Sequence, residues 1–591
     1  MNLTPEEKQI GSDNYYEALG ASSRRDFLKG VALAGVTSGA GLGAMYFGYG
    51  KTVGGDPVRV GVIGTGDEGS VLIGSLNPDY VEVKAICDIR PFSVHRAFHG
   101  DWASENTIKV RPGLMSVFDW KSEDEARRNV KVHTDYKELL KDPEIEAVII
   151  ALPLHLHAPV AIEAMMAGKH VLTEKLMAYD VASCKEMARV SDAQDLLLAT
   201  GHQRHYSVLY DNAVHLLRWG LLGELHHIRA QWHRGNLPGR DSWKQPIPGG
   251  EMSADGKSID KIKDTMERLQ AKVNSTSVSP ADLAKFEKQL AQWTAWNEDC
   301  SLEAANYGYE DITLSNGRNR SAMEELCRWR LWDRTGGGLM AELGSHQLDA
   351  ASIFISAMRQ DGKKAHPLSV HAVGGRHIFP VDRDCFDHVY CTFEFPAPGY
   401  EPQDAKNYYG FSDPYTGYDA TKGIPSYEQD NNKRIVVTYS SINGNGYGGY
   451  GEVVMGTKGT LVLEREKEVM LYKSSTSAKV TVKDDKGGPT MDTSYSGDSA
   501  GPVAKAADPG DVSRGYTEEI EHWAWCIRNR APENQPRCKP VVALGDAVIA
   551  LTCNVAMKNA AAGQGGYVQF KEEWFDVNSD ETPDGSKPRS V

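Results

Sequence analysis

The chain has 591 residues, with 80 acidic and 65 basic side chains and a formal net charge of -15. This balance, without a basic face in the sequence, argues against a nucleic-acid partner and favours a soluble enzyme with a neutral or small substrate. The length is sufficient for two domains, each with its own hydrophobic core.

The first fifty residues have the pattern of an export signal. Residues 23–29 carry twin arginines, and an uncharged stretch rich in Gly and Ala follows over residues 30–50. This order is typical of a twin-arginine signal, so we expect a periplasmic or otherwise exported protein that engages the twin-arginine export machinery. The small-residue cleavage sites at 38–40 and 42–44 are approximate, which leaves a retained membrane anchor open.

A dinucleotide-binding turn follows this segment. The apolar run 58–63 predicts a buried strand, and it leads into Gly64, Gly66 and Gly69. The first glycine permits a tight turn, the second lets a pyrophosphate approach the backbone, and the third lets the next helix pack against the strand. The same turn carries two further candidate cofactor contacts, Asp67 and Glu68.

A second predicted strand, residues 81–88, ends in Asp88, nineteen residues after Gly69. A carboxylate at this place accepts hydrogen bonds from the adenosine ribose and repels a 2′-phosphate, which favours NAD. Arg90 could instead receive a 2′-phosphate, so NADP stays an alternative. A Rossmann domain with an empty turn, or with another nucleotide-like ligand, also stays open.

The predicted fold is of the α/β class, with two domains. Strand and helix patterns alternate over residues 56–200, which predicts a doubly wound parallel sheet, the Rossmann arrangement. Residues 201–577 show longer alternating segments, which predict an α+β domain with an open, mostly antiparallel sheet.

Two insertions interrupt the second domain, at about 240–330 and 398–450. Within the first, residues 255–300 predict a helical hairpin that acts as a lid or as an oligomer contact. Residues 483–511 are expected to be mobile, and the tail 578–591 is expected to be disordered.

The ligand site of such a sheet lies at the carboxyl ends of its strands. Lys175 directly follows a predicted buried strand, where its ammonium can bond a substrate hydroxyl and favour the alkoxide during hydride removal. Alternatively, it pairs with Glu174 or with a cofactor ribose. The candidate cofactor contacts in these exit loops are Pro153, His157, Glu174, Lys175 and Gln203.

A triple glycine at 336–338 precedes Glu342, His346 and Asp349, whose spacings of four and three place them on one helical face. A histidine with a carboxylate one turn away can accept a proton from an alcohol. Glu342 and His346 could also ligate a metal, but no third ligand is evident and no cysteine pair has metal spacing, so no metal is predicted. The histidine could also be purely structural. The candidate substrate contacts are Arg204, Trp332 and Asp349.

With these segments in order, the chain resembles the Gfo/Idh/MocA family of glucose–fructose oxidoreductases and inositol dehydrogenases. The resemblance rests on the turn at 64–69, on 167–178 around the lysine, on 201–204, on 336–346 and on 454–460. The insertions and the export signal resemble the longer, secreted branch of that family.

The resemblance implies a two-domain dehydrogenase whose open sheet makes a homodimer or homotetramer. It also implies that Lys175 and His346 are the catalytic pair, supported by the acid at position 342. Two positions depart from the family pattern, because Leu176 stands in place of Pro and Glu342 in place of Asp.

We therefore expect an NAD-dependent oxidoreductase that acts on a secondary hydroxyl of a sugar, cyclitol or glycoside, with a tightly held cofactor. His346 would take the hydroxyl proton, Lys175 would polarise the oxygen, and Glu342 would orient His346. Two alternatives stay open: a hydrolase or lyase with a transient keto-sugar and no net redox change, and a non-catalytic sugar-binding protein loaded with dinucleotide.

Overall fold

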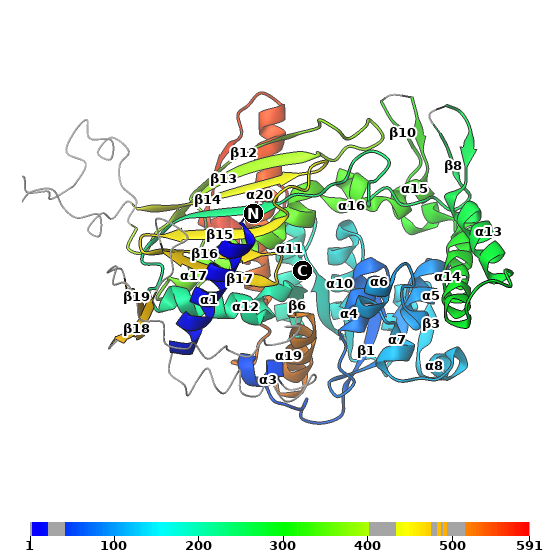
Figure 1. Cartoon of the computed structure of the whole chain (residues 1–591), viewed down its shortest axis with the longest axis horizontal. Helices are drawn as coiled ribbons and strands as arrows, with labels where there is room; N and C mark the ends of the chain where they lie inside the picture. The colour runs from blue at the N-terminus through cyan, green and yellow to red at the C-terminus, as the bar shows by residue number, and fades with distance from the viewer. Residues whose placement is uncertain are drawn as a thin grey trace, which may run out of the picture.

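The computed structural model describes residues 3–21, 42–253, 255–315, 317–400, 433–473, 481–485, 488–492 and 514–589. Figure 1 shows two main sheets, a blue and cyan parallel sheet on one side and a larger green and yellow sheet on the other. The predicted α/β architecture with two domains is confirmed.

The N-terminal domain is built on a six-stranded parallel sheet in the order β3-β2-β1-β4-β5-β6. This order places β1 and β4 at the topological switch point, outside which ligands bind in doubly wound folds. The central strands are apolar along nearly their whole length because helices cover both faces. The strands are β1 (Val58–Ile63), β2 (Val81–Cys87), β3 (Lys131–His133), β4 (Ala147–Ile150), β5 (His170–Glu174) and β6 (Leu198–Gly201).

Helices from both ends of the chain cover this sheet. Helix α19 comes from the C-terminal part and packs against β1, β5 and β6. The helices of this layer are α3 (Leu42–Phe47), α4 (Asp67–Gly74), α5 (Pro91–His99), α6 (Glu105–Val110), α7 (Leu114–Val117), α8 (Glu123–Asn129), α9 (Tyr136–Leu140), α10 (His157–Met166), α11 (Val181–Ala193) and α19 (Tyr516–Arg528).

The second domain contains an eight-stranded sheet in the order β17-β16-β15-β7-β14-β13-β12-β20. All neighbours are antiparallel except β7 and β14, so the predicted mostly antiparallel sheet is confirmed. Burial alternates along β14, as expected when one face packs on helices. The strands are β7 (Leu225–Trp232), β12 (Ser369–Gly375), β13 (His388–Pro396), β14 (Arg434–Ile442), β15 (Tyr450–Gly456), β16 (Gly459–Glu464), β17 (Glu468–Lys473) and β20 (Tyr567–Gln569).

Helices α12 (Val208–Arg218), α17 (Ser345–Ala357) and α20 (Pro540–Ala561) pack under this sheet. By length and composition α20 could cross a membrane, a feature the sequence analysis did not anticipate. Most of its residues are nevertheless buried against α11, α17 and β12. A core helix of a water-soluble protein has the same composition, so this feature alone does not indicate a membrane span.

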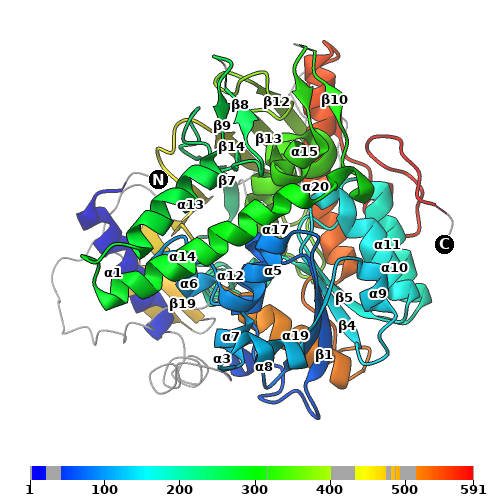
Figure 2. The same cartoon turned by 90° about the vertical axis from the view of Figure 1, so that its right-hand side faces the viewer.

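The first insertion forms the predicted helical hairpin, α13 (Lys261–Val273) and α14 (Pro280–Glu298). Figure 2 shows the two green helices side by side over α5 of the N-terminal domain, and α14 packs directly on α5. Short pieces complete the insertion: β8 (Glu251–Met252), β9 (Ser258–Ile259), η3 (Asp299–Ser301), η4 (Ala304–Tyr307), β10 (Ile312–Thr313), β11 (Asn319–Arg320), α15 (Ala322–Cys327) and η5 (Trp329–Leu331).

Two terminal segments belong to the folded body, contrary to expectation. Helix α1 (Pro5–Ala21) precedes the twin arginines and packs on β17, with Tyr15 and Leu19 buried in the core. The tail after Val577 was expected to be disordered, and this prediction is wrong for residues 578–589. Lys185 and Arg189 on α11 donate hydrogen bonds to the carbonyl oxygen of Ser579, which holds the tail in place.

Other predictions fall outside the described residues. These are the twin arginines themselves, most of 483–511, and residues 401–432 of the second insertion. That insertion is also narrower than predicted, because β14 lies inside the 398–450 range as a central strand.

Candidate active site

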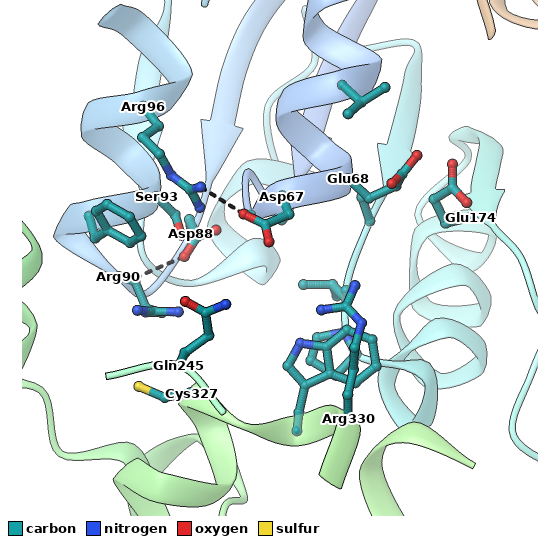
Figure 3. A pocket seen from close by; sticks show the side chains of 18 of the residues that line it. Asp67, Glu68, Asp88, Arg90, Ser93, Arg96, Glu174, Gln245, Cys327 and Arg330 are labelled. Carbon is teal, nitrogen blue, oxygen red and sulfur yellow. Dashed lines mark hydrogen bonds and ion pairs between the residues drawn. The ribbon is translucent and has the colours of Figure 1, made fainter. Parts of the chain in front are cut away.

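A cleft of about 1830 Å³ lies at the carboxyl ends of the parallel strands, where doubly wound sheets bind ligands. A typical small-molecule pocket measures roughly 300–1,000 Å³, so the cleft has room for a dinucleotide and a second ligand. Its walls come from both domains and from the first insertion. Figure 3 shows acids and arginines of the N-terminal domain facing Gln245, Cys327 and Arg330 of the insertion across this space.

The glycine turn has the predicted geometry. Gly64 has a φ of 88°, and a Cβ built there would lie 2.3 Å from the carbonyl oxygen of Ala151. A Cβ on Gly69 would lie 2.1 Å from the carbonyl oxygen of Gly64. Gly66 has open space at its Cβ position and lines the cleft, so its backbone is accessible to a phosphate.

Asp88 is positioned by the turn that it faces. Its carboxylate accepts hydrogen bonds from the backbone N–H of Thr65 at 2.8 Å and of Arg90 at 2.9 Å. The Arg90 side chain turns to the insertion, where its Nε donates to the buried Asp299 at 2.8 Å. Arg90 is therefore engaged with the hairpin region, and Asp88 remains at the place expected for ribose recognition.

The two acids that begin α4 have different environments. Asp67 pairs with Arg96 at 2.7 Å and with Arg111 at 3.4 Å. These arginines outweigh its burial and hold its pKa below the ordinary value. Glu68 also lines the cleft and lies near Glu174. The two predicted cofactor contacts thus reach the site, but Asp67 does so as part of an ion-pair network.

Several buried polar atoms at the ends of β5 and β6 have no hydrogen-bond partner within the described chain. They are Oε1 of Glu174 and both amide atoms of Gln203, and both residues line the cleft. Burial and the nearby Glu68 raise the pKa of Glu174 well above the ordinary value, so that its carboxyl favours the protonated, donating form. Orphaned donors and acceptors of this kind fit the ribose and carboxamide of a nicotinamide nucleotide.

Lys175 bridges the two domains. Its Nζ donates a 2.7 Å hydrogen bond to the backbone carbonyl oxygen of Glu342. The Lys175–Leu176 peptide bond is cis, although Leu176 stands where the family has Pro. The ring of His157 lies 2.8 Å from the carbonyl oxygens of both Leu152 and Leu176, which fixes this loop. His157 is thus a positioning residue, whereas Pro153 lines the cleft directly.

Glu342 does not orient His346, contrary to the prediction. Its carboxylate accepts a 2.7 Å hydrogen bond from Nε of Arg330. Burial alone would raise the pKa of Glu342, but Arg330 and Lys175 hold it at about 2. The residue sits in η6 (Met340–Gly344), a π-helical turn, so the α-helical spacing assumed from the sequence does not hold between Glu342 and His346.

His346 lies in the first turn of α17 and lines the cleft beside Lys175. Its ring centroid is 5.4 Å from that of Trp232. Burial, with the neighbouring charges of Lys175 and Arg204, lowers the pKa of His346 well below its ordinary value. The imidazole is therefore neutral at pH 7, the state in which it can accept a proton.

Asp349, a predicted substrate contact, is buried and is not among the residues that line the cleft. It accepts a 3.0 Å hydrogen bond from Nε2 of His205. His202, Cys538 and Asp546 lie close by. One possible ligand atom from each of them lies within 4.8 Å of the others, a spacing that could hold a metal ion. The ammonium of Lys364, 2.5 Å from Asp546, supplies a positive charge there.

The other two predicted substrate contacts are structural. Arg204 is buried and forms ion pairs with Glu452 at 3.1 Å and Glu466 at 2.7 Å, in the interior of the second domain. Trp332 is 2% exposed, packs under the guanidinium of Arg320 and does not line the cleft. Neither reaches the space beside Lys175.

Sequence analysis missed the residues that form the floor of the substrate end. Trp232 stacks on Tyr450 with ring centroids 4.4 Å apart and an angle of 14° between the planes. Arg234 and Arg330 line the same region. Trp232 is the last residue of β7, and its stacking partner Tyr450 on β15 is more than 200 residues away in the sequence, so local patterns do not indicate the pair.

The N-terminal domain matches a known family model. Residues 58–202 match the model described as the oxidoreductase family with an NAD-binding Rossmann fold, Gfo/Idh/MocA. A glycosyl hydrolase family 109 protein from Solibacter usitatus is 31% identical over 219 residues, 36% of this chain and 46% of that protein. An alpha-N-acetylgalactosaminidase from Shewanella oneidensis is 30% identical over 176 residues, 30% of this chain and 35% of that protein. The matches thus span less than half the length of these relatives.

Among solved structures, an oxidoreductase domain protein from Kribbella flavida is similar at 13% identity, covering 88% of this chain and all of that chain, with a TM-score of 0.49. Four observations indicate that the cofactor is NAD. They are the glycine turn, the acid after β2, the orphaned polar atoms and the family match. The N-terminal domain, residues 58–202, thus matches the NAD-binding Rossmann fold of the Gfo/Idh/MocA oxidoreductase family.

Proposed function

We propose that this protein is an NAD-dependent oxidoreductase that removes hydride from a secondary hydroxyl carbon of a sugar, cyclitol or glycoside. The observation that carries the proposal is the convergence of Lys175 and the neutral His346 on one end of a dinucleotide cleft. An ammonium donor and an imidazole acceptor together are the groups that alcohol oxidation requires.

His346 accepts the hydroxyl proton in the proposed reaction, and the ammonium of Lys175 stabilises the negative charge that develops on the oxygen. Bound NAD supplies the hydride acceptor at its nicotinamide ring. Glu342 holds Lys175 through its backbone and Arg330 through its carboxylate, so it is a positioning residue. Trp232, stacked on Tyr450, forms an aromatic wall next to His346, against which the apolar side of a sugar can pack.

We also propose that the cofactor is held tightly, because the hairpin region closes the adenosine end of the cleft. Asp299 accepts hydrogen bonds from Arg90 and from the backbone N–H of Phe92. Phe92 stacks on Trp296 of α14 with ring centroids 4.3 Å apart. The hairpin is thereby attached to the same loop that follows Asp88. This attachment favours the role of a lid for the hairpin, and not the role of an oligomer contact.

A second candidate is redox-assisted glycoside cleavage, in which a transient ketone promotes loss of the leaving group and is then reduced again. It is favoured by the names of the two relatives described above, a family 109 hydrolase and an alpha-N-acetylgalactosaminidase. The same Lys175 and His346 would serve both reactions, which differ in whether NADH accumulates.

One experiment separates these functions. The cofactor is released from the purified full-length protein by denaturation, before and after incubation with a panel of sugars and aryl glycosides, and its absorbance and mass are recorded. Accumulated NADH supports net oxidation, whereas oxidised NAD together with free aglycone supports cleavage. Absence of any nicotinamide would contradict both.

Export by the twin-arginine machinery and assembly into a homodimer or homotetramer remain predictions of the sequence. Fractionation of the native host and light scattering of the purified protein test them independently of activity.

A further inference from the structure

Arg234 is a half-buried cation at the substrate end of the cleft. It lies two residues after the end of β7, and its guanidinium lies 5.4 Å from the ring of Trp232 and 6.0 Å from the ring of Trp243. It lines the cleft together with His346 and Tyr450. Two tryptophan rings thus hold the guanidinium in one place, which limits its rotation.

The charge of Arg234 has no acidic partner within 4 Å among the described residues. The arginines that line the cleft otherwise have carboxylates within that distance: Arg90 with Asp299, Arg96 and Arg111 with Asp67, Arg330 with Glu342, and Arg514 with Glu466. Arg268 is exposed, and there solvent replaces a partner. Burial lowers the pKa of Arg234, and the nearby Arg330 lowers it further. A half-buried, unpaired guanidinium is costly, and an incoming anion would remove that cost.

The surroundings of Arg234 are positive as a whole. Glu342 is the one carboxylate that Lys175, Arg234 and Arg330 have in common among the described residues, and Lys175 also lies beside Glu174, which burial keeps protonated. Arg330 also lies near Asp67 and Glu68 at the pyrophosphate end, so its positive charge interacts with acids at both ends of the cleft. Arg234 has no such contact with the cofactor turn. The local charge is positive, opposite in sign to the net charge of the chain, from which a neutral or small substrate was expected.

We propose that Arg234 binds an acidic substituent of the substrate, so that the natural substrate is an acidic sugar such as a uronic acid or a sulfated sugar. This inference rests on the proposed function and names its substrate class. A sugar that lies against the edge of the Trp232–Tyr450 pair would present a hydroxyl to His346 and an acidic group to Arg234. The planar guanidinium matches a carboxylate or a sulfate with two parallel hydrogen bonds.

The test measures binding of matched sugar pairs to the NAD-loaded, full-length protein by calorimetry at low salt. The pairs are glucuronate with glucose and galacturonate with galactose, and glucose 6-sulfate distinguishes a sulfate from a carboxylate. We expect at least one acidic sugar to bind more than about 10-fold tighter than its neutral partner. We expect Arg234→Met to weaken that binding by about 10- to 100-fold, since a hydrogen bond to a charged group is lost.

Two further variants control the result. Arg234→Lys keeps the charge without the planar fork and should recover part of the affinity. Arg240→Met removes the same charge from the exposed surface of the same loop, outside the cleft, and should leave affinity unchanged. Equal binding of acidic and neutral sugars, no binding of any acidic sugar, or an unchanged Arg234→Met variant would each overturn the proposal.

The same samples separate this inference from the proposed function. Formation of NADH is followed for every sugar. Turnover of acidic and neutral sugars at equal kcat/KM would support the oxidoreductase function and contradict the preference for an acidic substrate. Arg234-dependent binding of an acid without NADH or aglycone would retain the anion site and contradict the oxidoreductase.

Discussion

The Nζ of Lys175 donates a 2.7 Å hydrogen bond to the backbone carbonyl oxygen of Glu342. The lysine directly follows β5 of the Rossmann domain, whereas Glu342 lies in the π-helical turn that leads into α17 of the second domain. The position of the lysine beside His346 therefore depends on how the two domains pack.

The low pKa of His346 predicts an unusual pH profile. Because the base must be neutral to accept a proton, activity is retained above its pKa and lost below it. Burial and the charges of Lys175 and Arg204 lower this pKa from 6.5. We expect kcat/KM for sugar oxidation to stay level from about pH 8 to about pH 6, and to fall only at lower pH. A midpoint at the ordinary histidine value would show that His346 is not the base.

The hairpin region should control cofactor retention. Asp299→Asn removes the charge that pairs with Arg90 while keeping the size of the side chain. We expect about a 30-fold increase in the Kd of NAD, because removing one partner of a buried ion pair costs about 2 kcal/mol. Dialysis followed by measurement of bound NAD checks this. Glu287→Gln, the same change on the exposed face of α14, should retain NAD as the wild type does. If both variants retained as much NAD as the wild type, the proposal that the hairpin is a lid over the cofactor would be contradicted.

The C-terminal tail should contribute to stability. The ammonium of Lys185 is buried and donates to the carbonyl oxygens of Glu573, Ser579 and Glu581 at 2.7–2.9 Å. Truncation after Val577 removes two of these acceptors, the carbonyl oxygens of Ser579 and Glu581, and leaves the buried ammonium with one of its three hydrogen bonds. We expect the free energy of unfolding to fall by about 3 kcal/mol, measured by urea denaturation.

A second variant isolates the cause of that loss. In a Lys185→Met background the buried charge is absent, so the same truncation should cost clearly less than in the wild type. Equal costs in both backgrounds would mean that the tail stabilises the fold by other contacts, and no cost in either would restore the prediction of a disordered tail.

Local patterns predicted the parts of the site that local backbone geometry determines. The turn at Gly64 and Gly69 follows from close approaches within a few residues, and Lys175 follows from its place at a strand end. The helical hairpin was predictable because its apolar residues recur with helical spacing.

Pairings between distant elements were not predictable. Glu342 and Asp349 were assigned to one helical face, but a π-helical turn intervenes and each carboxylate found a partner on another element, Arg330 and His205 respectively. Arg204 was predicted to contact substrate, yet it pairs with Glu452 on β15 and Glu466 after β16, some 250 residues away in the sequence. Charge pairing of this kind depends on the assembled sheet rather than on spacing.

The central claim is that Lys175 performs chemistry in a site that holds NAD independently of it. Single-turnover reduction of the bound cofactor is the direct measurement, comparing the wild type with Lys175→Met at saturating sugar. We expect the variant to retain bound NAD and to reduce it about 100- to 10,000-fold more slowly. Reduction at the wild-type rate by the NAD-loaded variant would contradict the proposed catalytic role of Lys175.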